Sequence, residues 1–408
     1  MSQRVVVIDC EATTYATGNP FSSPNKLMCV GVHADGQYLY FDIEHSGQPY
    51  GNNLRALEKI LNDAHLIVGF NIKYDLHWIR KYLPNVRFNA VFDCQLAEFL
   101  LSNQSVIFPS LESCSEYYHL PPKCLDIEQD YWDKGINTDQ VPLDILKHRV
   151  LSDVEITNLL YQQQGPRLEE QDKLALFTLQ CQDTLVLQEM EFNGMLFDEV
   201  EAARLGVETN SEITRITYEL NRAYPDVTIN WNSGDHLSAI LYGGFINQDG
   251  VEEVHKTRKD GSVRIYERKA LVKQLMPRLV DPLPNTESKD TKGLSDDDIE
   301  RLNVERGRKP HAQRIYYTNE QVLKSLPARG RAKEIISCIQ RLATLEKLSS
   351  TYYLGIPKLI AELAWEGGVI HGQFNQVVAR TGRLSSSQPN LQNFAGVIKP
   401  LFKSRYAS

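Results

Sequence analysis

Hydrophobic and polar positions in the first 165 residues alternate between strand-like and helical periods. A β-branched run at 4–8 and apolar segments at 27–32, 37–43 and 66–71 predict strands. Apolar residues at helical spacing predict helices over 53–64, 74–83, 94–102 and 143–163. Three strands followed by strands that alternate with helices indicate a mixed α/β domain that closes near Gly165-Pro166.

The rest of the chain is mostly helical in pattern. Helical spacing runs from 167 to about 245 and returns at 328–350 and 355–366. The tail from Gly367 has strand and loop character, and we expect it to need another surface to pack on because it lacks a core of its own. The expected organisation is a first domain over 1–165, a helical region over 166–366 with a polar insertion at 246–314 carrying a strand-like patch at 262–268, and a last segment over 367–408.

Composition excludes several classes of protein. The 408 residues are 42% hydrophobic and 24% charged, which is typical of globular domains. No apolar run approaches the roughly 20 residues that cross a bilayer, and the N-terminus leads directly into a strand-like segment without a signal peptide, so we expect a cytoplasmic protein. The seven cysteines include no CxxC pair and are expected to be reduced; Cys114, His119 and Cys124 lack the close ligand pairs of a zinc site.

Charge is distributed unevenly along the chain. Residues 1–300 carry 46 acidic and 27 basic side chains, whereas residues 301–408 carry 6 acidic and 17 basic ones. The basic residues of the second part are scattered and interleaved with tyrosines such as Tyr316, Tyr317, Tyr352 and Tyr353. This pattern favours a surface that follows a phosphate backbone over a merely solvated basic face.

Two acidic side chains end the first predicted strand. Asp9 and Glu11 are two residues apart, so both project from the same face of the strand. Two solvated surface acids are the ordinary explanation of such a pair. Because a continuous apolar strand precedes them, where an unpaired charge is costly, a shared metal site is an equal alternative.

Two further segments supply polar side chains of the same kind. In GFNIKYD a strand runs into a helix, where Asn71 can cap the helix and Asp75 follows one turn later. In HRVLSD, His148 and Asp153 lie within a helical stretch. Four acids and a nearby histidine fit two Mg²⁺ or Mn²⁺ ions about 3.5–4 Å apart, an arrangement that hydrolyses phosphodiesters.

These three segments resemble, in order and spacing, the motifs of the DEDD 3′–5′ exonucleases. The resemblance covers residues 4–163 and implies a ribonuclease H-like fold with Asp9, Glu11, Asp75 and Asp153 as metal ligands. One subclass has a tyrosine four residues before the last acid, and here that position holds Arg149. The other has a histidine five residues before it, which makes His148 the expected general base. The alternatives are a site without a base and an Arg149 that binds phosphate.

The second half resembles family A DNA polymerases. MEFNGMLFD (190–198) and NWNSGDHL (230–237) are similar to the start of their polymerase region, and TGRLSSSQPNLQN (381–393) is very similar to a family signature. The resemblance implies contacts to primer-template DNA through Arg383, Asn390 and Gln392, and we expect single-stranded DNA to be degraded from its 3′ end. The remaining candidate DNA contacts are Asn71, Lys347, Ser349, Ser350, Thr351, His371, Arg380, Thr381 and Ser385.

The palm aspartate, the fingers helix and the His-Asp-Glu motif of that family are not found in these residues. We therefore expect the exonuclease, thumb and first palm segment of a split, phage-type polymerase, with no polymerase activity alone and with a separately encoded chain supplying palm and fingers. Two alternatives remain: a catalytically idle DNA-binding subunit of the same polymerase, and a fragment of a gene interrupted by an intron or intein.

Overall fold

The computed structural model describes residues 4–257, 262–305 and 314–406. The chain divides into two compact units. The first unit joins residues 1–201 to 355–408, and the second comprises residues 202–354. The division into compact units does not test the domain limits predicted at residues 165 and 366. These limits stay predictions.

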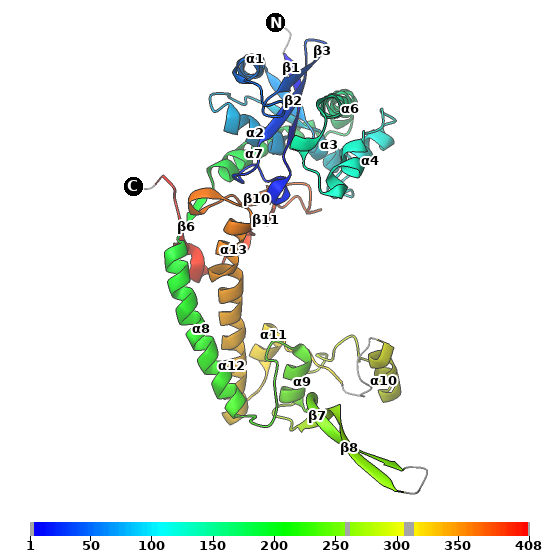
Figure 1. Ribbon diagram of the computed structural model, residues 1–408, viewed down its shortest axis with the longest axis vertical. Helices are drawn as coiled ribbons and strands as arrows, with labels where there is room; N and C mark the ends of the chain where they lie inside the picture. The colour runs from blue at the N-terminus through cyan, green and yellow to red at the C-terminus, as the bar shows by residue number, and fades with distance from the viewer. Residues whose placement is uncertain (1–3, 258–261, 306–313, 407–408) are drawn as a thin grey trace. The chain divides into compact units, whose positions relative to one another are not determined.

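A five-stranded mixed sheet forms the centre of the first unit (Figure 1). Its order is β3 (Gln37–Asp42), β2 (Leu27–Ala34), β1 (Val5–Ala12), β4 (Leu66–Gly69) and β5 (Val91–Asp93). β1 is antiparallel to β2 and parallel to β4. The central strands are buried because their residues are a nearly continuous β-branched and apolar run. The expected mixed α/β fold is therefore confirmed.

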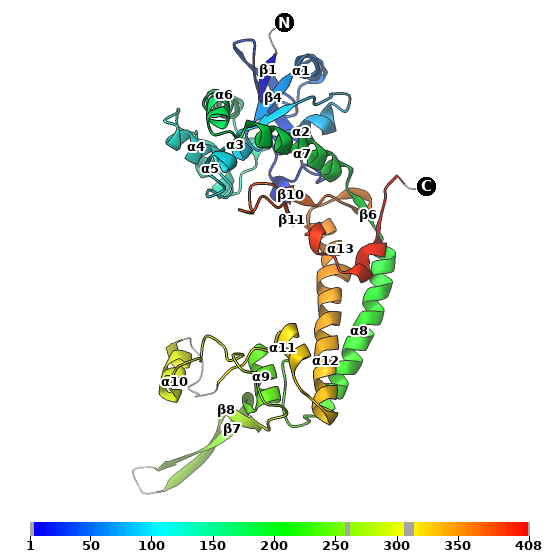
Figure 2. The same cartoon turned by 180° about the vertical axis from the view of Figure 1, so that it is seen from behind.

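Helices cover both faces of this sheet. α1 (Gly51–Asn62) and α6 (Leu143–Glu170) lie on opposite sides of it in both views (Figures 1 and 2). The other helices of this part are α2 (Ile72–Tyr82), α3 (Cys94–Leu101), α4 (Leu111–Tyr117), α5 (Asp126–Asp130) and α7 (Leu174–Asn193).

The predicted end of the first domain near Gly165-Pro166 does not interrupt a helix, because α6 continues through both residues to Glu170. Gln164 is buried and donates to the Cys94 carbonyl, and Leu168 is fully buried. Tertiary packing thus outweighs the local cost of a proline inside the helix. Asn71 precedes α2 with a positive φ of 55° and no side-chain hydrogen bond to the helix, so the expected side-chain cap is wrong.

The C-terminal segment packs on the same chain. β12 (Phe402–Lys403) and β9 (Val369–Ile370) flank β6 (Met195–Phe197) in a small sheet, and β10 (Gln373–Asn375) pairs with β11 (Ser385–Ser387). Ile398 and Leu401 are buried there. The surface that this segment was expected to need is therefore provided by this chain itself. α13 (Gly355–Glu362) precedes the segment.

The second unit is built on two long helices, α8 (Glu199–Arg222) and α12 (Gly330–Lys347), which lie side by side in both views (Figures 1 and 2). A π-helical turn, Leu348–Tyr353, extends α12. The short strand expected at 262–268 belongs to a long hairpin of β7 (Gly244–Thr257) and β8 (Val263–Met276). The strand is longer than expected because every residue of β8 pairs with a residue of β7. α9 (Gly234–Tyr242), α10 (Asp296–Glu305) and α11 (Glu320–Ser325) complete the unit. Positions 258–261 and 306–313 of the predicted insertion lie outside the described residues.

Among the described residues, no helix is both long and apolar enough to span a membrane.

Candidate active site

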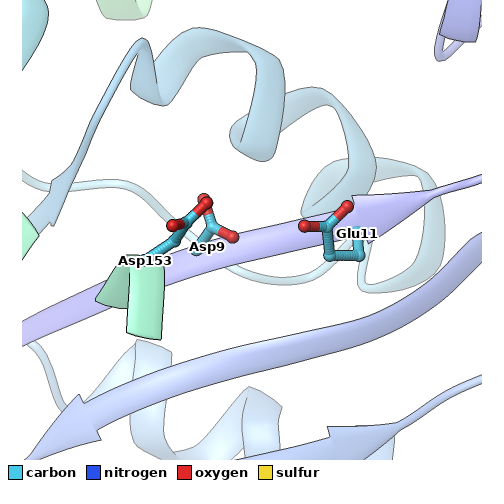
Figure 3. A group of neighbouring side chains, drawn as sticks. All are labelled: Asp9, Glu11 and Asp153. Carbon is cyan, nitrogen blue, oxygen red and sulfur yellow. The ribbon is translucent and has the colours of Figure 1, made fainter. Parts of the chain in front are cut away.

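Three carboxylates from two elements converge beside the central strand. Asp9 and Glu11 project from the same face of β1, and Asp153 projects from α6 toward Asp9 (Figure 3). One ligand oxygen from each of the three lies within 4.8 Å of the others. We call Asp9, Glu11 and Asp153 the carboxylate cluster. The alternation of side chains along a strand explains the first two positions, and helix packing supplies the third.

A glycine allows α6 to approach the sheet. Gly31 of β2 is the register partner of Asp9. A Cβ atom at Gly31 would lie 2.9 Å from Cγ2 of Val154 and 3.0 Å from the carbonyl oxygen of Val150, both on α6. The sequence interpretation missed this residue, although a glycine within an apolar strand often marks a close approach.

Burial and mutual repulsion dominate the electrostatics of the cluster. Burial raises the pKa of Asp9 well above its ordinary value, and the charges of Asp153, Asp75 and Glu11 raise it further. Burial also raises the pKa of Glu11, to about 7, although Arg149 opposes this shift. Without a counter-charge, the site therefore disfavours full ionisation of its acids.

Asp75 lies next to the cluster on α2. Its Oδ1 accepts a hydrogen bond of 2.9 Å from the backbone N–H of Cys10, the residue between Asp9 and Glu11. Burial raises the pKa of Asp75 well above its ordinary value, although that hydrogen bond opposes the shift. Asp75 is close enough to act electrostatically on Asp9. The structure thus brings the four predicted acids into one region.

Two cationic side chains also reach Asp153. Arg149 Nε lies 3.0 Å from Asp153 Oδ2 and 3.5 Å from Glu11 Oε1. Lys123 Nζ lies 3.3 Å from the same Asp153 oxygen. The remaining guanidinium nitrogens of Arg149 donate to Glu128 of α5, over 2.6 and 2.7 Å, and to the Cys124 carbonyl. Glu128 and Lys123 were not predicted from the sequence, because nothing in their local pattern distinguishes them from surface charges.

The cluster suits a hard divalent cation. Asp153 is 3% exposed, yet its Oδ1 atom has no hydrogen-bond partner among the described residues. A buried carboxylate oxygen without a partner is costly, and a cation between Asp153, Asp9 and Glu11 would satisfy it. Oxygen-only donors are those that Mg²⁺ and Mn²⁺ prefer.

His148 is placed elsewhere. It is exposed on α6, and its Nδ1 lies 3.6 Å from Cys124 Sγ. His148 is five residues before Asp153 and therefore points in a different direction from it on the helix. Arg149 is four residues before Asp153, shares its face and contacts it. The role of general base stays a prediction for His148, and the structure does not bring it to the carboxylates.

Comparisons with known proteins agree with this geometry. Residues 2–168 match the family model described as "3'-5' exonuclease", and residues 285–405 match the model "DNA polymerase family A". The chain combines a 3′–5′ exonuclease domain with part of a family A DNA polymerase domain. The carboxylate cluster lies in the exonuclease domain.

Similar curated proteins are DNA polymerases. The chain is 25% identical over 402 residues to DNA polymerase I of Pseudomonas aeruginosa, covering 94% of this chain and 37% of that protein. It is 27% identical to the thermostable DNA polymerase I of Thermus aquaticus, over 56% of this chain and 20% of that one. DNA polymerase DpoZ of Acinetobacter phage SH-Ab 15497 is 25% identical over 53% of this chain and 35% of its own length. The chain therefore spans 37% or less of these relatives.

A solved structure shares the fold. The POL domain of Pol1 from M. smegmatis, in complex with DNA primer-template and dNTP, matches with a TM-score of 0.60 and 17% identity. The match covers 97% of this chain and 52% of that one.

Most predicted DNA contacts are exposed side chains. On the polymerase-domain segment, Arg380, Thr381 and Arg383 surround a turn at Gly382, whose φ is +73°. Asn390 accepts a hydrogen bond from the Gln392 N–H, which shapes the next turn. Ser385 is half-buried on β11, and the exposed candidates elsewhere are Asn71, Lys347, Ser350 and Thr351.

Two predicted DNA contacts are instead buried. Ser349 donates to Asn210 Oδ1 over 2.9 Å. His371 stacks on Phe21 with a centroid distance of 4.0 Å, and its Nδ1 contacts the Glu191 carbonyl at 2.8 Å. Burial lowers the pKa of His371 to about 4, so the ring is neutral at pH 7 and offers no charge to a phosphate.

A buried carboxylate next to His371 was not predicted. The carboxylate of Glu191, on α7, contacts Lys73 Nζ at 2.5 Å and His77 Nε2 at 2.9 Å. It also accepts from the Phe374 N–H of β10 over 2.6 Å. Although burial alone would raise the pKa of Glu191, His77 and Lys73 hold it below its ordinary value. The Glu191 carboxylate therefore connects α2, which also carries Asp75, to β10, which precedes the polymerase signature at 381–393.

Proposed function

We propose that this chain removes nucleotides from the 3′ end of DNA at the carboxylate cluster, as the proofreading nuclease of a family A polymerase. The observation that carries the proposal is the convergence of Asp9, Glu11 and Asp153 within 4.8 Å, with Asp75 beside them, in a domain that matches the 3′–5′ exonuclease family.

We infer that Asp9, Glu11, Asp75 and Asp153 hold two Mg²⁺ or Mn²⁺ ions. When bound, these ions would supply the positive charge that activates water and stabilises the 3′ leaving oxygen. The protein's own contribution is to position four acids on β1, α2 and α6 and to keep them in a buried site, where charge interactions are strong. His148 stays the candidate base, and a proton transfer by it would require its exposed ring to reach the substrate.

The test uses a 5′-labelled single-stranded DNA and the purified chain. With Mg²⁺ or Mn²⁺ we expect shortening from the 3′ end, which EDTA abolishes. Asp9→Ala removes a proposed metal ligand and should reduce the rate by at least the roughly 10–100-fold that losing a partner of a metal ligand costs. Asp226→Ala, at an exposed acid of the second unit, should leave the rate unchanged. Equal rates for Asp9→Ala and the wild type would refute the proposal.

We further propose that the chain binds primer-template DNA through its polymerase-domain segment and that nucleotidyl transfer requires residues outside these 408. The support is chemical. That reaction needs a second set of metal-binding acids, and the only acidic residues in 301–408 are the glutamates Glu305, Glu320, Glu334, Glu346, Glu362 and Glu366. A separately encoded chain carrying palm and fingers would supply them, as would a longer form of this chain. Primer extension with these 408 residues, alone and with a candidate partner, tests this point; extension by the 408 residues alone would overturn it.

Two observations favour a second function, DNA binding without cleavage. Arg149 and Lys123 already neutralise part of Asp153, and the predicted base is not beside the cluster. Binding of primer-template DNA with no cleavage in Mn²⁺ would support this alternative.

A further inference from the structure

Each guanidinium nitrogen of Arg149 has a hydrogen-bond or ion-pair partner in the acidic site. Its side chain is 5% exposed, and its nitrogens contact three carboxylates and one carbonyl: Asp153, Glu11, Glu128 and Cys124 O. Its guanidinium also lies 5.9 Å from the centre of the Trp132 ring. A planar guanidinium held at both ends in this way has little freedom to leave. Arg149 is therefore a fixed charge of the site.

The two ends of the guanidinium have different partners. Glu128 binds both terminal nitrogens in a bidentate pair, at 2.6 and 2.7 Å, and belongs to α5 rather than to the cluster. The inner nitrogen, Nε, faces the cluster: it donates a hydrogen bond of 3.0 Å to Asp153 Oδ2 and lies 3.5 Å from Glu11 Oε1. Glu128 thus anchors the arginine, and Asp153 receives its charge.

The two oxygens of Asp153 have different surroundings. Oδ2 is held by Arg149 and Lys123, whereas Oδ1 has no hydrogen-bond partner among the described residues. Asp153 is one of the three residues of the carboxylate cluster. Like charges a few ångströms apart in a buried site repel one another more strongly than they would in water. Arg149 therefore opposes the binding of any other cation to the same acids.

We propose that Arg149, anchored by Glu128, is a resident counter-cation of the carboxylate cluster: it balances Glu11 and Asp153 and lowers their affinity for a divalent ion. This inference rests on the proposed metal site and adds a residue that sets its affinity. Arg149 is a positioning residue, because it acts through Asp153 and Glu11.

The test measures Mn²⁺ binding by isothermal titration calorimetry, without DNA, on the purified chain. Arg149→Met removes the charge, and we expect Mn²⁺ to bind about tenfold more tightly while the metal-free protein melts at a lower temperature. Glu128→Gln removes the anion that compensates Arg149, and we expect Mn²⁺ to bind several-fold more weakly. Opposite signs from two neighbouring variants are the signature of a charge effect, because a loss of packing would weaken binding in both.

Two controls keep the result interpretable. Arg149→Lys retains the charge, so its Mn²⁺ affinity should stay within about twofold of the wild type even if it melts earlier. Arg149→Gln, which also removes the charge, replaces Arg149→Met if that variant does not fold. Arg341→Met breaks a bidentate pair with Glu212 in the second unit and should not change Mn²⁺ affinity.

The outcomes separate this inference from the proposed function. Unchanged or weaker Mn²⁺ binding by Arg149→Met overturns the inference, even where the wild type cleaves DNA. A wild type that binds no Mn²⁺, beside an Arg149→Met variant that binds it, supports the inference and overturns metal-dependent cleavage by the wild type. Weaker binding in both Arg149→Met and Glu128→Gln overturns the inference, because the pair would then only hold the ligands in place.

Discussion

Gly31 lies directly opposite Asp9 in the register of β1 and β2, on the face of the sheet against which α6 packs. The absence of a side chain at Gly31 therefore determines how closely Asp153 of α6 approaches Asp9.

Gly31→Ala should push α6 away from the sheet. The added Cβ would meet Val154 at 2.9 Å and the Val150 backbone at 3.0 Å, which real contacts do not tolerate without movement. We expect a loss of about 1–3 kcal/mol in the free energy of unfolding, measured by urea denaturation, and about tenfold weaker Mn²⁺ binding, measured by calorimetry.

Gly165→Ala is the matched control. Gly165 lies on α6, the helix that carries Asp153, and a Cβ atom added there would meet open space. Gly165→Ala should leave Mn²⁺ binding unchanged. If Gly31→Ala binds Mn²⁺ like the wild type, the close approach of α6 does not position the site.

Metal binding should release a proton near neutral pH. Burial raises the pKa of Glu11 to about 7 in the metal-free protein, and a carboxylate must ionise to bind a cation. The apparent Mn²⁺ affinity should therefore rise between pH 6 and pH 8, by up to about tenfold per unit for one proton. Calorimetry in two buffers with different ionisation enthalpies counts the protons, and Glu11→Gln should release fewer; equal release at pH 6.5 by both would contradict the assignment.

The same shift has a consequence for metal-free stability. Because the folded pKa of Glu11 is raised, its contribution to stability is fully present below its unfolded value, about 4.3, and is lost as the pH rises through about 7. The melting temperature in EDTA should therefore fall over this range more steeply for the wild type than for Glu11→Gln. Parallel melting curves for the two proteins would show that Glu11 does not titrate differently on folding.

Glu191 should stabilise the first unit in a pH-dependent manner. Its side chain is 2% exposed and is paired with Lys73 and His77. Glu191→Gln therefore leaves the half-buried Lys73 without its anion and should cost about 3 kcal/mol at pH 7. Because the pKa of Glu191 is lowered in the folded state, this contribution is present above its unfolded pKa and is lost as the pH falls through the folded value.

Urea denaturation at pH 7 and at pH 3 checks this expectation: the difference between Glu191→Gln and the wild type should shrink at pH 3. Asp130→Asn is the control, since it breaks an exposed pair with Lys134 and should cost less than about 1 kcal/mol. A difference that does not depend on pH would mean that Glu191 acts by packing alone.

Arg383 should bind DNA through a phosphate or a base edge. It is exposed next to the turn at Gly382. Arg383→Ala should weaken primer-template binding and, if the contact is to a phosphate, reduce the slope of log affinity against log salt by about one. Fluorescence anisotropy at several salt concentrations measures both, with the exposed Lys59→Ala of α1 as control. Equal affinities and slopes for Arg383→Ala and the wild type would remove Arg383 from the DNA contacts.

Local patterns were sufficient for several of the elements and for part of the site, whereas β5, α4 and α5 were not predicted. The apolar run before Asp9 predicted β1, and the two-residue period of a strand placed Glu11 beside Asp9. Local patterns failed where packing decided: α6 continues past Gly165-Pro166 because Gln164 and Leu168 are buried. Helical geometry turns Arg149 rather than His148 toward the cluster.

Sequence patterns alone were enough for the mixed α/β class and for the order of the motifs, because strand and helix periods and short motifs are local properties. The proposal that the four acids are metal ligands came from the resemblance of those motifs to the DEDD exonucleases. Only the tertiary structure decided that Gly31 admits α6, that Glu128 anchors Arg149 against Asp153, and that Glu191 lies between Lys73 and His77. The partners come from separate elements: Arg149 and Glu128 are 21 positions apart in the chain, and Gly31 and Val154 are 123 positions apart. Close packing and the pairing of buried charges create these relationships, and neither leaves a local pattern in the sequence.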